Sequence, residues 1–149
     1  MIESGTPFPS FSLANQDGQT VTQNDWKGQK VVVYFYPKDD TSGCTVEACE
    51  FRDTLPDIPG VTVVGVSPDN SKSHRKFADK YNLNFTLLAD TDHSLCDAVG
   101  VWVEKSMYGK KYMGVERTTF ILDESGVIVK IFNKVKPQGH ASEVKAAIA

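Results

Sequence analysis

Cysteine and long apolar segments are scarce in this chain, and each scarcity excludes a class of protein. Three cysteines among 149 residues are an odd number, which does not suit a small scaffold held together by disulfide bonds. The longest apolar runs, such as Val31–Tyr36, are far too short to span a bilayer. The first residues, MIESGTPFPSF, show no basic segment followed by an apolar one, so no secretory signal is visible. We therefore expect free thiols, no membrane partner and a cytoplasmic location.

The charge balance and the histidines exclude further classes. The chain has 16 basic and 19 acidic residues, a net charge of −3 and no basic run, so we expect no nucleic-acid partner. His74, His93 and His140 lack metal-ligand spacing with one another or with the cysteines, and we expect no metal or other cofactor. A hydrophobic content of 40% over 149 residues suits one domain, residues 1–149, with a sizeable core.

The hydrophobic pattern predicts an alternation of strands and helices. A turn signal at Gln16-Asp17-Gly18 predicts a hairpin within residues 8–24, and Pro56 and Pro59 are expected to end the first helix. Residues 104–114 are expected to form an irregular or hairpin loop. Strands are predicted at 31–36, 61–66, 85–89, 115–122 and 127–132, and helices at 44–55, 72–81, 94–99 and 140–149. This order predicts an α/β fold of the thioredoxin-like type, with a central mixed sheet flanked by helices and an N-terminal hairpin extension.

The most informative segment is residues 31–50, VVVYFYPKDDTSGCTVEACE. An apolar strand ends at Pro37, which has no N–H for a sheet ladder, and a polar turn leads to a helix that starts at or just before Cys44. The free N–H groups and the dipole of a helix N-terminus favour an anion there. A cysteine in such a position commonly has a lowered pKa, so the segment predicts a reactive thiol.

A second cysteine, Cys49, follows five residues after Cys44. In an intact helix the two residues are about 7.5 Å apart along the axis and on different faces. A disulfide requires Cα atoms within about 7 Å and side chains that face each other. If the two cysteines bond, the first turns of the helix must unwind, which makes the pair a candidate redox switch.

The segment YFYPKDDTSGCTVEAC resembles the active site of peroxiredoxins, most closely the bacterioferritin comigratory protein or peroxiredoxin Q subfamily. The likeness extends over nearly the whole chain, including NQDGQTVT, LLADTDHSLCDAVGVW and GVERTTFILD. Ser42 departs from the family pattern, because many members have proline there. The family's active-site positions fall on Pro37, Thr41, Cys44, Cys49 and Arg117.

This resemblance implies a thiol peroxidase that reduces hydrogen peroxide and organic hydroperoxides without a prosthetic group. It implies that Cys44 attacks the peroxide and becomes a sulfenic acid, and that Cys49 then condenses with it to an intramolecular disulfide. Thr41 and Arg117 would position the peroxide and stabilise charge, and Pro37 would shield the thiol. The resemblance also implies reduction by thioredoxin or a similar dithiol, and a monomer.

Structural explanations exist for several of these residues. Cys96 lies on the apolar side of a short helix and is expected to be structural, although it is the alternative partner for Cys44. Arg117 could be a surface charge on a strand face shared with Val115 and Thr119, and Thr41 could serve only as a helix N-cap.

Two other functions and one substrate-binding surface also remain open. A protein disulfide reductase would use a Cys-x-x-Cys motif, whereas a redox sensor would be oxidised once without turnover. An apolar loop is a candidate rim for organic hydroperoxides, although its residues are more often core anchors. The residues of this loop are Met107, Tyr108, Tyr112 and Met113.

Overall fold

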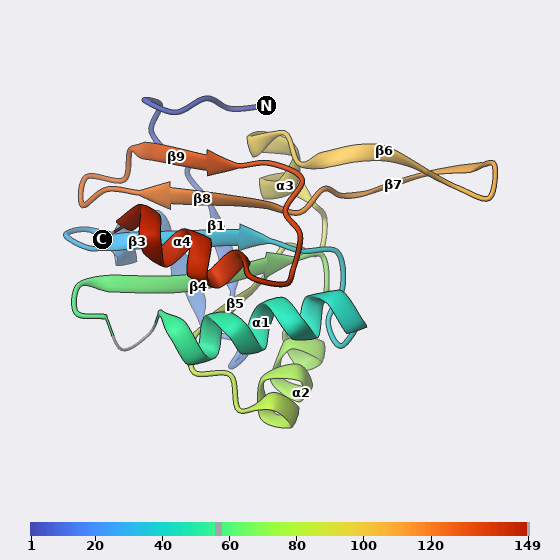
Figure 1. Cartoon of the computed structure of the whole chain (residues 1–149), viewed down its shortest axis with the longest axis horizontal. Helices are drawn as coiled ribbons and strands as arrows, with labels where there is room; N and C mark the ends of the chain where they lie inside the picture. Colours follow the sequence, from blue (N-terminus) through green and yellow to red (C-terminus); the bar gives the residue numbers. More distant parts are fainter. Residues whose placement is uncertain (56–57, 149) are drawn as a thin grey trace.

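The computed structural model describes residues 1–55 and 58–148 (Figure 1). The strands are β1 (Ser12–Ala14), β2 (Thr20–Thr22), β3 (Lys30–Phe35), β4 (Val61–Ser67), β5 (Thr86–Ala89), β6 (Trp102–Met107), β7 (Lys110–Val115), β8 (Thr118–Leu122) and β9 (Ile128–Phe132). The helices are the 3₁₀ helix η1 (Gln23–Trp26) and the α-helices α1 (Ser42–Thr54), α2 (Ser71–Tyr81), α3 (Ser94–Val99) and α4 (His140–Ile148).

A seven-stranded mixed sheet forms the centre of the molecule, in the order β2-β1-β5-β4-β3-β8-β9. Strand β4 pairs in parallel with β3 and β5, whereas β3–β8 and β8–β9 are antiparallel. The β1–β2 hairpin adds to the edge through one antiparallel pair between Ala14 and Ala89. The predicted mixed sheet, its flanking helices and its N-terminal hairpin are therefore confirmed.

Two hydrophobic clusters cover the two faces of this sheet, which explains why the central strand β3 reads as a continuous apolar run. Val31, Val33 and Phe35 face one cluster, and the intervening residues of β3 face the other. The first cluster includes side chains from α3 and from the N-terminal segment, whereas the second includes side chains from α1, α2 and α4. In Figure 1, α1 and α4 lie in front of the sheet.

The predicted strand over residues 115–122 is wrong, because it is interrupted at Glu116 and Arg117. Strand β7 ends at Val115 and β8 begins at Thr118. The Glu116 N–H donates to the Val101 carbonyl, whereas the Arg117 carbonyl accepts from the Val135 N–H. The chain changes partners at this point because it passes from the two-stranded β6–β7 sheet into the central sheet. Arg117 therefore belongs to a junction and not to a regular strand face.

Residues 104–114 form most of a regular hairpin, β6–β7, which projects away from the central sheet in Figure 1. Tyr108 and Gly109 connect the two strands, and both have positive φ angles, 53° and 77°. Two successive residues with positive φ match the twist of a two-residue hairpin turn. The hairpin alternative of the sequence prediction is thus confirmed.

The helices agree closely with their predicted ranges. Helix α1 begins at Ser42, two residues before Cys44, and Asn70 caps α2 by accepting the Ser73 N–H at 2.8 Å. The predicted stop at Pro56 and the predicted last helical residue, Ala149, lie outside the described residues. Within residues 1–55 and 58–148, no helix combines the length and apolar character that crossing a membrane requires.

Candidate active site

Cys44 lies at the N-terminal end of α1, directly after the loop that leaves β3. The last N–H of the strand region, from Tyr36, donates to the Val66 carbonyl, and the chain then turns through Asp40 at a φ of 56°. The Thr41 carbonyl accepts the Thr45 N–H at 2.8 Å and so begins the helix. Cys44 is buried, with 1% of its surface exposed. The predicted combination of a thiol and a helix N-terminus is therefore present.

Arg117 contacts the sulfur of Cys44 from the junction between β7 and β8. Its Nη2 lies 3.1 Å from Cys44 Sγ, and its Nη1 lies 3.1 Å from Glu47 Oε1. The Arg117 side chain is only 19% exposed, so water screens its charge weakly. Two residues from distant parts of the sequence thus place a positive charge directly against the thiol, which favours a negative sulfur.

Gly43 makes this approach possible because it has no side chain. A Cβ at Gly43 would lie 2.9 Å from Nη2 of Arg117 and 3.3 Å from Cγ of Pro137. The first distance is shorter than real Cβ contacts, so any larger residue would displace the guanidinium. The glycine before the cysteine is therefore required by the close packing of Arg117.

Glu47 was not identified from the sequence, although it lies one helical turn after Cys44. Residues three apart on a helix share a face, and this spacing was the available signal. The carboxyl is 1% exposed, and burial raises its pKa from 4.5 to about 7 while the charge of Arg117 opposes the rise. Among the described residues, Glu47 Oε2 has no hydrogen-bond partner. Glu47 thus holds one terminal nitrogen of Arg117 while Cys44 contacts the other.

Thr41 occupies the N-cap position of α1, but its side chain does not cap the helix. The hydroxyl donates to the Lys38 carbonyl at 3.0 Å, and no side-chain capping bond is present. Because the hydroxyl hydrogen is used in this way, the Thr41 oxygen keeps lone pairs that can accept a hydrogen bond. The side chain is exposed at the start of the helix, and Pro37 is half-buried at the start of the same loop.

The three cysteines occupy different environments, and all are free thiols. Cys49 is half-buried further along α1. Cys96 is completely buried in α3, within the cluster on the opposite face of the sheet from Cys44. Burial and a hydrogen bond to Asp90 raise the pKa of the Cys96 thiol far above its ordinary range. These surroundings agree with the structural role expected for Cys96.

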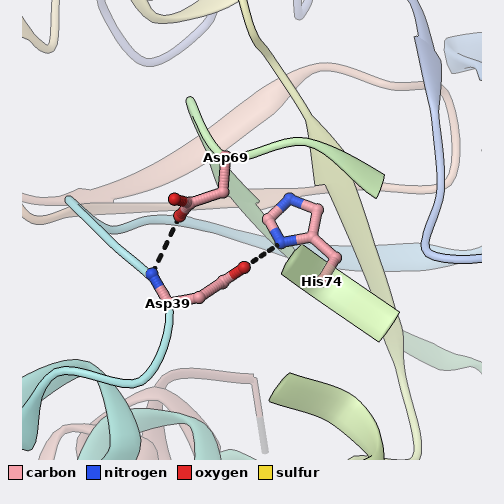
Figure 2. A group of neighbouring side chains, drawn as sticks. All are labelled: Asp39, Asp69 and His74. Carbon is pink, nitrogen blue, oxygen red and sulfur yellow. Dashed lines mark hydrogen bonds and ion pairs between the residues drawn. The ribbon is translucent and has the colours of Figure 1, made fainter. Parts of the chain in front are cut away.

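A cluster of Asp39, Asp69 and His74 lies beside the same loop and was not identified from the sequence (Figure 2). One potential ligand atom from each residue lies within 4.8 Å of the others. Asp39 Oδ2 is 2.7 Å from His74 Nδ1, and the Asp39 N–H donates to Asp69 Oδ2 at 2.8 Å. Asp69 and His74 lie five residues apart around the start of α2, whereas Asp39 comes from the loop after β3, so no single local motif indicates the whole cluster.

The β6–β7 hairpin carries Lys105 and an exposed apolar surface. Burial, followed by the charge of Arg117, lowers the pKa of Lys105, whereas Glu116 and Cys44 oppose that change. The expectation that the apolar hairpin residues anchor the core is wrong, because these residues are exposed and project from the body with the hairpin. They are Met107, Tyr108, Tyr112 and Met113.

Comparisons with known proteins agree with this geometry. A model of the AhpC/TSA family matches residues 4–131. A curated relative from Coxiella burnetii, named putative peroxiredoxin bcp, is 52% identical over 145 residues and covers 96% of each chain. Peroxiredoxin Bcp from Escherichia coli is 46% identical over 141 residues, which are 93% of this chain and 90% of that protein.

Solved structures give the same result. The bacterioferritin comigratory protein of Xanthomonas campestris has a TM-score of 0.90 and 40% identity, covering 98% of this chain and 97% of that one. A variant of Xylella fastidiosa PrxQ has a TM-score of 0.93 and 36% identity, covering 99% and 96%. The fold is that of a peroxiredoxin, a thiol-dependent peroxidase, and the chain belongs to the AhpC/TSA family. Within that family it is of the bacterioferritin comigratory protein, or peroxiredoxin Q, type.

Proposed function

We propose that Cys44 is the nucleophile of this peroxidase and that Arg117 activates it. The observation that carries the proposal is the 3.1 Å contact between Arg117 Nη2 and Cys44 Sγ at the start of α1. A guanidinium beside the sulfur and the dipole of the helix both favour the thiolate, which is the reactive form.

In the first step the Cys44 thiolate attacks one oxygen of a hydroperoxide. The O–O bond breaks, an S–O bond forms, and the second oxygen leaves as alkoxide or hydroxide and takes up a proton. Arg117 and the first N–H groups of α1 are donors for the charge that develops on the oxygens. The Thr41 oxygen accepts a hydrogen bond from the peroxide O–H, because its own hydrogen is held by Lys38. Pro37 shields the sulfur from water.

In the second step Cys49 resolves the Cys44 sulfenic acid. The Cys49 sulfur attacks Cys44, a disulfide forms, and water leaves. A dithiol then donates two electrons and restores both thiols, and we propose thioredoxin as that reductant. Disulfide formation requires the start of α1 to unwind, which breaks the contacts of Arg117 with Cys44 and Glu47. Cys96 takes no part, since it lies across the sheet.

The proposed substrates are hydrogen peroxide and organic hydroperoxides. The Xanthomonas campestris relative has alkyl peroxide reduction activity, which supports an organic hydroperoxide as a substrate of this chain. The proposed form is a monomer in the cytoplasm, in keeping with the free thiols.

A coupled assay tests the proposal. NADPH oxidation is followed with thioredoxin reductase, thioredoxin, this protein and either hydrogen peroxide or an organic hydroperoxide. We expect sustained turnover by the wild-type protein and by Cys96→Ser, and none by Cys44→Ser. Turnover by Cys44→Ser at the wild-type rate would refute the assignment of the nucleophile. Rapid reduction of insulin disulfides without peroxide turnover would favour a disulfide reductase, and a single oxidation without turnover would favour a sensor.

A further inference from the structure

Asp39 and His74 form a buried polar pair that the proposed chemical steps do not use. Asp39 lies in the loop between β3 and α1 and is 7% exposed, whereas His74 lies on α2 and is completely buried. Figure 2 shows the carboxylate of Asp39 directed at the ring of His74. Most buried polar groups are hydrogen-bonded, so the partners of each atom indicate what the pair does.

The hydrogen bonds of His74 define where its protons lie. Nε2 is 2.9 Å from the Leu88 carbonyl oxygen, which can only accept, so Nε2 carries a hydrogen. Nδ1 is 2.7 Å from Asp39 Oδ2, which also accepts the Ser73 hydroxyl at 2.8 Å. Tyr36 donates to Oδ1 at 2.5 Å, so both carboxyl oxygens of Asp39 are hydrogen-bonded. Both ring nitrogens of His74 are also hydrogen-bonded, and the pair therefore has a single defined geometry.

Tyr36 is a reliable donor in this network. Burial, reinforced by the neighbouring Tyr34 and Asp39, raises the pKa of Tyr36 well above its ordinary value, so its hydroxyl keeps its hydrogen. The network thus ties the loop to β3 through Tyr36 and to α2 through Ser73 and His74.

The same loop residues lead directly to the catalytic groups. The Asp39 N–H is held by Asp69 Oδ2, and Asp40 accepts from Lys80 and Tyr81 of α2, each at 2.8 Å. The Lys38 carbonyl, one peptide earlier, accepts the Thr41 hydroxyl. A shift of Asp39 would therefore move the Lys38 carbonyl and, with it, the Thr41 hydroxyl.

We propose that the Asp39–His74 pair is a positioning element for peroxide reduction, which fixes the loop so that the Thr41 hydroxyl meets the peroxide correctly. This inference rests on the proposed function of Cys44. His74 and Asp39 act through Thr41 and the backbone and do not touch the substrate. The contact between Arg117 and Cys44 comes from another part of the fold, so loss of the pair leaves the thiol itself activated.

Two reactions of Cys44, one with hydrogen peroxide and one with an alkylating agent, distinguish a positioning role from a general loss of structure. Reaction with hydrogen peroxide, measured by competition with horseradish peroxidase, needs the aligned donors and acceptors, whereas alkylation by iodoacetamide needs only the thiolate. We expect His74→Leu to lower the peroxide rate constant about 10- to 100-fold and to leave alkylation of Cys44 within about twofold of wild type. Asp39→Asn, which keeps a hydrogen-bonding amide opposite a neutral His74, is expected to retain most of the peroxide rate.

One control is a variant elsewhere in α2, and a second measurement is made on wild-type protein. Ala78→Gly weakens α2 without touching Asp39 and is expected to keep both rates. In wild-type protein, ¹⁵N NMR at neutral pH should show Nε2 of His74 protonated, because it faces the Leu88 carbonyl, and this result does not depend on any variant folding. A bare Nε2, a wild-type peroxide rate in His74→Leu, or an equal loss of both rates would overturn the inference. If wild-type protein and Cys44→Ser were equally inactive toward peroxide, the proposed function itself would fail.

Discussion

The sulfur of Cys44 lies 3.1 Å from Nη2 of Arg117, although the two residues are 73 positions apart in the sequence. The same guanidinium reaches Glu47 through its other terminal nitrogen. Both partners belong to α1, so the position of Arg117 depends on an intact first stretch of that helix. In the proposed mechanism, activation of the thiol and the folded state of α1 are therefore coupled, and the unwinding that a disulfide needs removes the activating charge.

Replacement of Arg117 tests this coupling at its centre. Lysine keeps a charge but cannot bridge two partners with a planar fork, and methionine removes the charge. We expect Arg117→Met to lower the rate constant for hydrogen peroxide about 100-fold or more, and Arg117→Lys to give an intermediate loss. Stopped-flow kinetics on reduced protein measures both. Arg75→Met, which removes an exposed arginine of α2, is the matched control and should react like the wild type.

A methyl group at Gly43 is expected to separate activity from stability. Gly43→Ala favours helix formation by up to about 1 kcal/mol. The new Cβ would meet Nη2 of Arg117, so the guanidinium must move away from Cys44. We expect the rate constant for hydrogen peroxide to fall by up to about 10-fold. The free energy of unfolding is expected to stay within about 1 kcal/mol of wild type. An unchanged peroxide rate would show that the contact with Arg117 does not control reactivity.

Glu47 makes a specific contribution to the pH dependence of stability. Because its pKa rises from 4.5 to about 7 on folding, the folded protein holds a proton that the unfolded chain releases in this interval. The free energy of unfolding therefore falls as pH rises from 4.5 to 7, by up to about 3 kcal/mol from this group. Glu47→Gln should flatten that part of the profile, as measured by urea unfolding at several pH values. A variant profile parallel to that of wild type would contradict the assignment.

Oxidation should loosen the start of α1 and its contact with the chain before α4. Glu50 Oε1 accepts the Gly139 N–H at 2.8 Å, which ties α1 to that segment. Unwinding toward Cys49 breaks this bond, so Glu50→Ala should speed disulfide formation by about fivefold. Quenched alkylation after peroxide addition measures the rate, with the exposed Glu124→Ala as control. Hydrogen exchange over residues 42–50 should rise on oxidation in the wild type and stay unchanged in Cys49→Ser.

Local sequence was sufficient for part of the site. The apolar run of β3, the polar turn and the helix formers after Gly43 predict where Cys44 lies, because each signal is contained in one short segment. Arg117 could be named only by family resemblance, and its placement on a regular strand was wrong. Periodicity does not show where a chain changes partners between two sheets, which is what happens at Glu116.

The remaining residues of the site depend on tertiary structure. Glu47 could have been anticipated from its helical spacing, but its burial follows from packing against the sheet. The Asp39–His74 pair could not be predicted, because it joins a loop to a helix 35 residues away. The exposure of the hairpin residues was predicted wrongly, because the same apolar residue types occur at an exposed hairpin tip and in a loop that packs on the core.

The most direct test of this account is to identify the partner of Cys44 after oxidation. Reduced protein is treated with one equivalent of hydrogen peroxide, free thiols are blocked, and peptides are mapped by mass spectrometry without reduction. We predict one major product, a Cys44–Cys49 disulfide, with Cys96 alkylated only after denaturation. A Cys44–Cys96 disulfide, or a Cys44 that remains a free thiol while peroxide is consumed, would contradict the account.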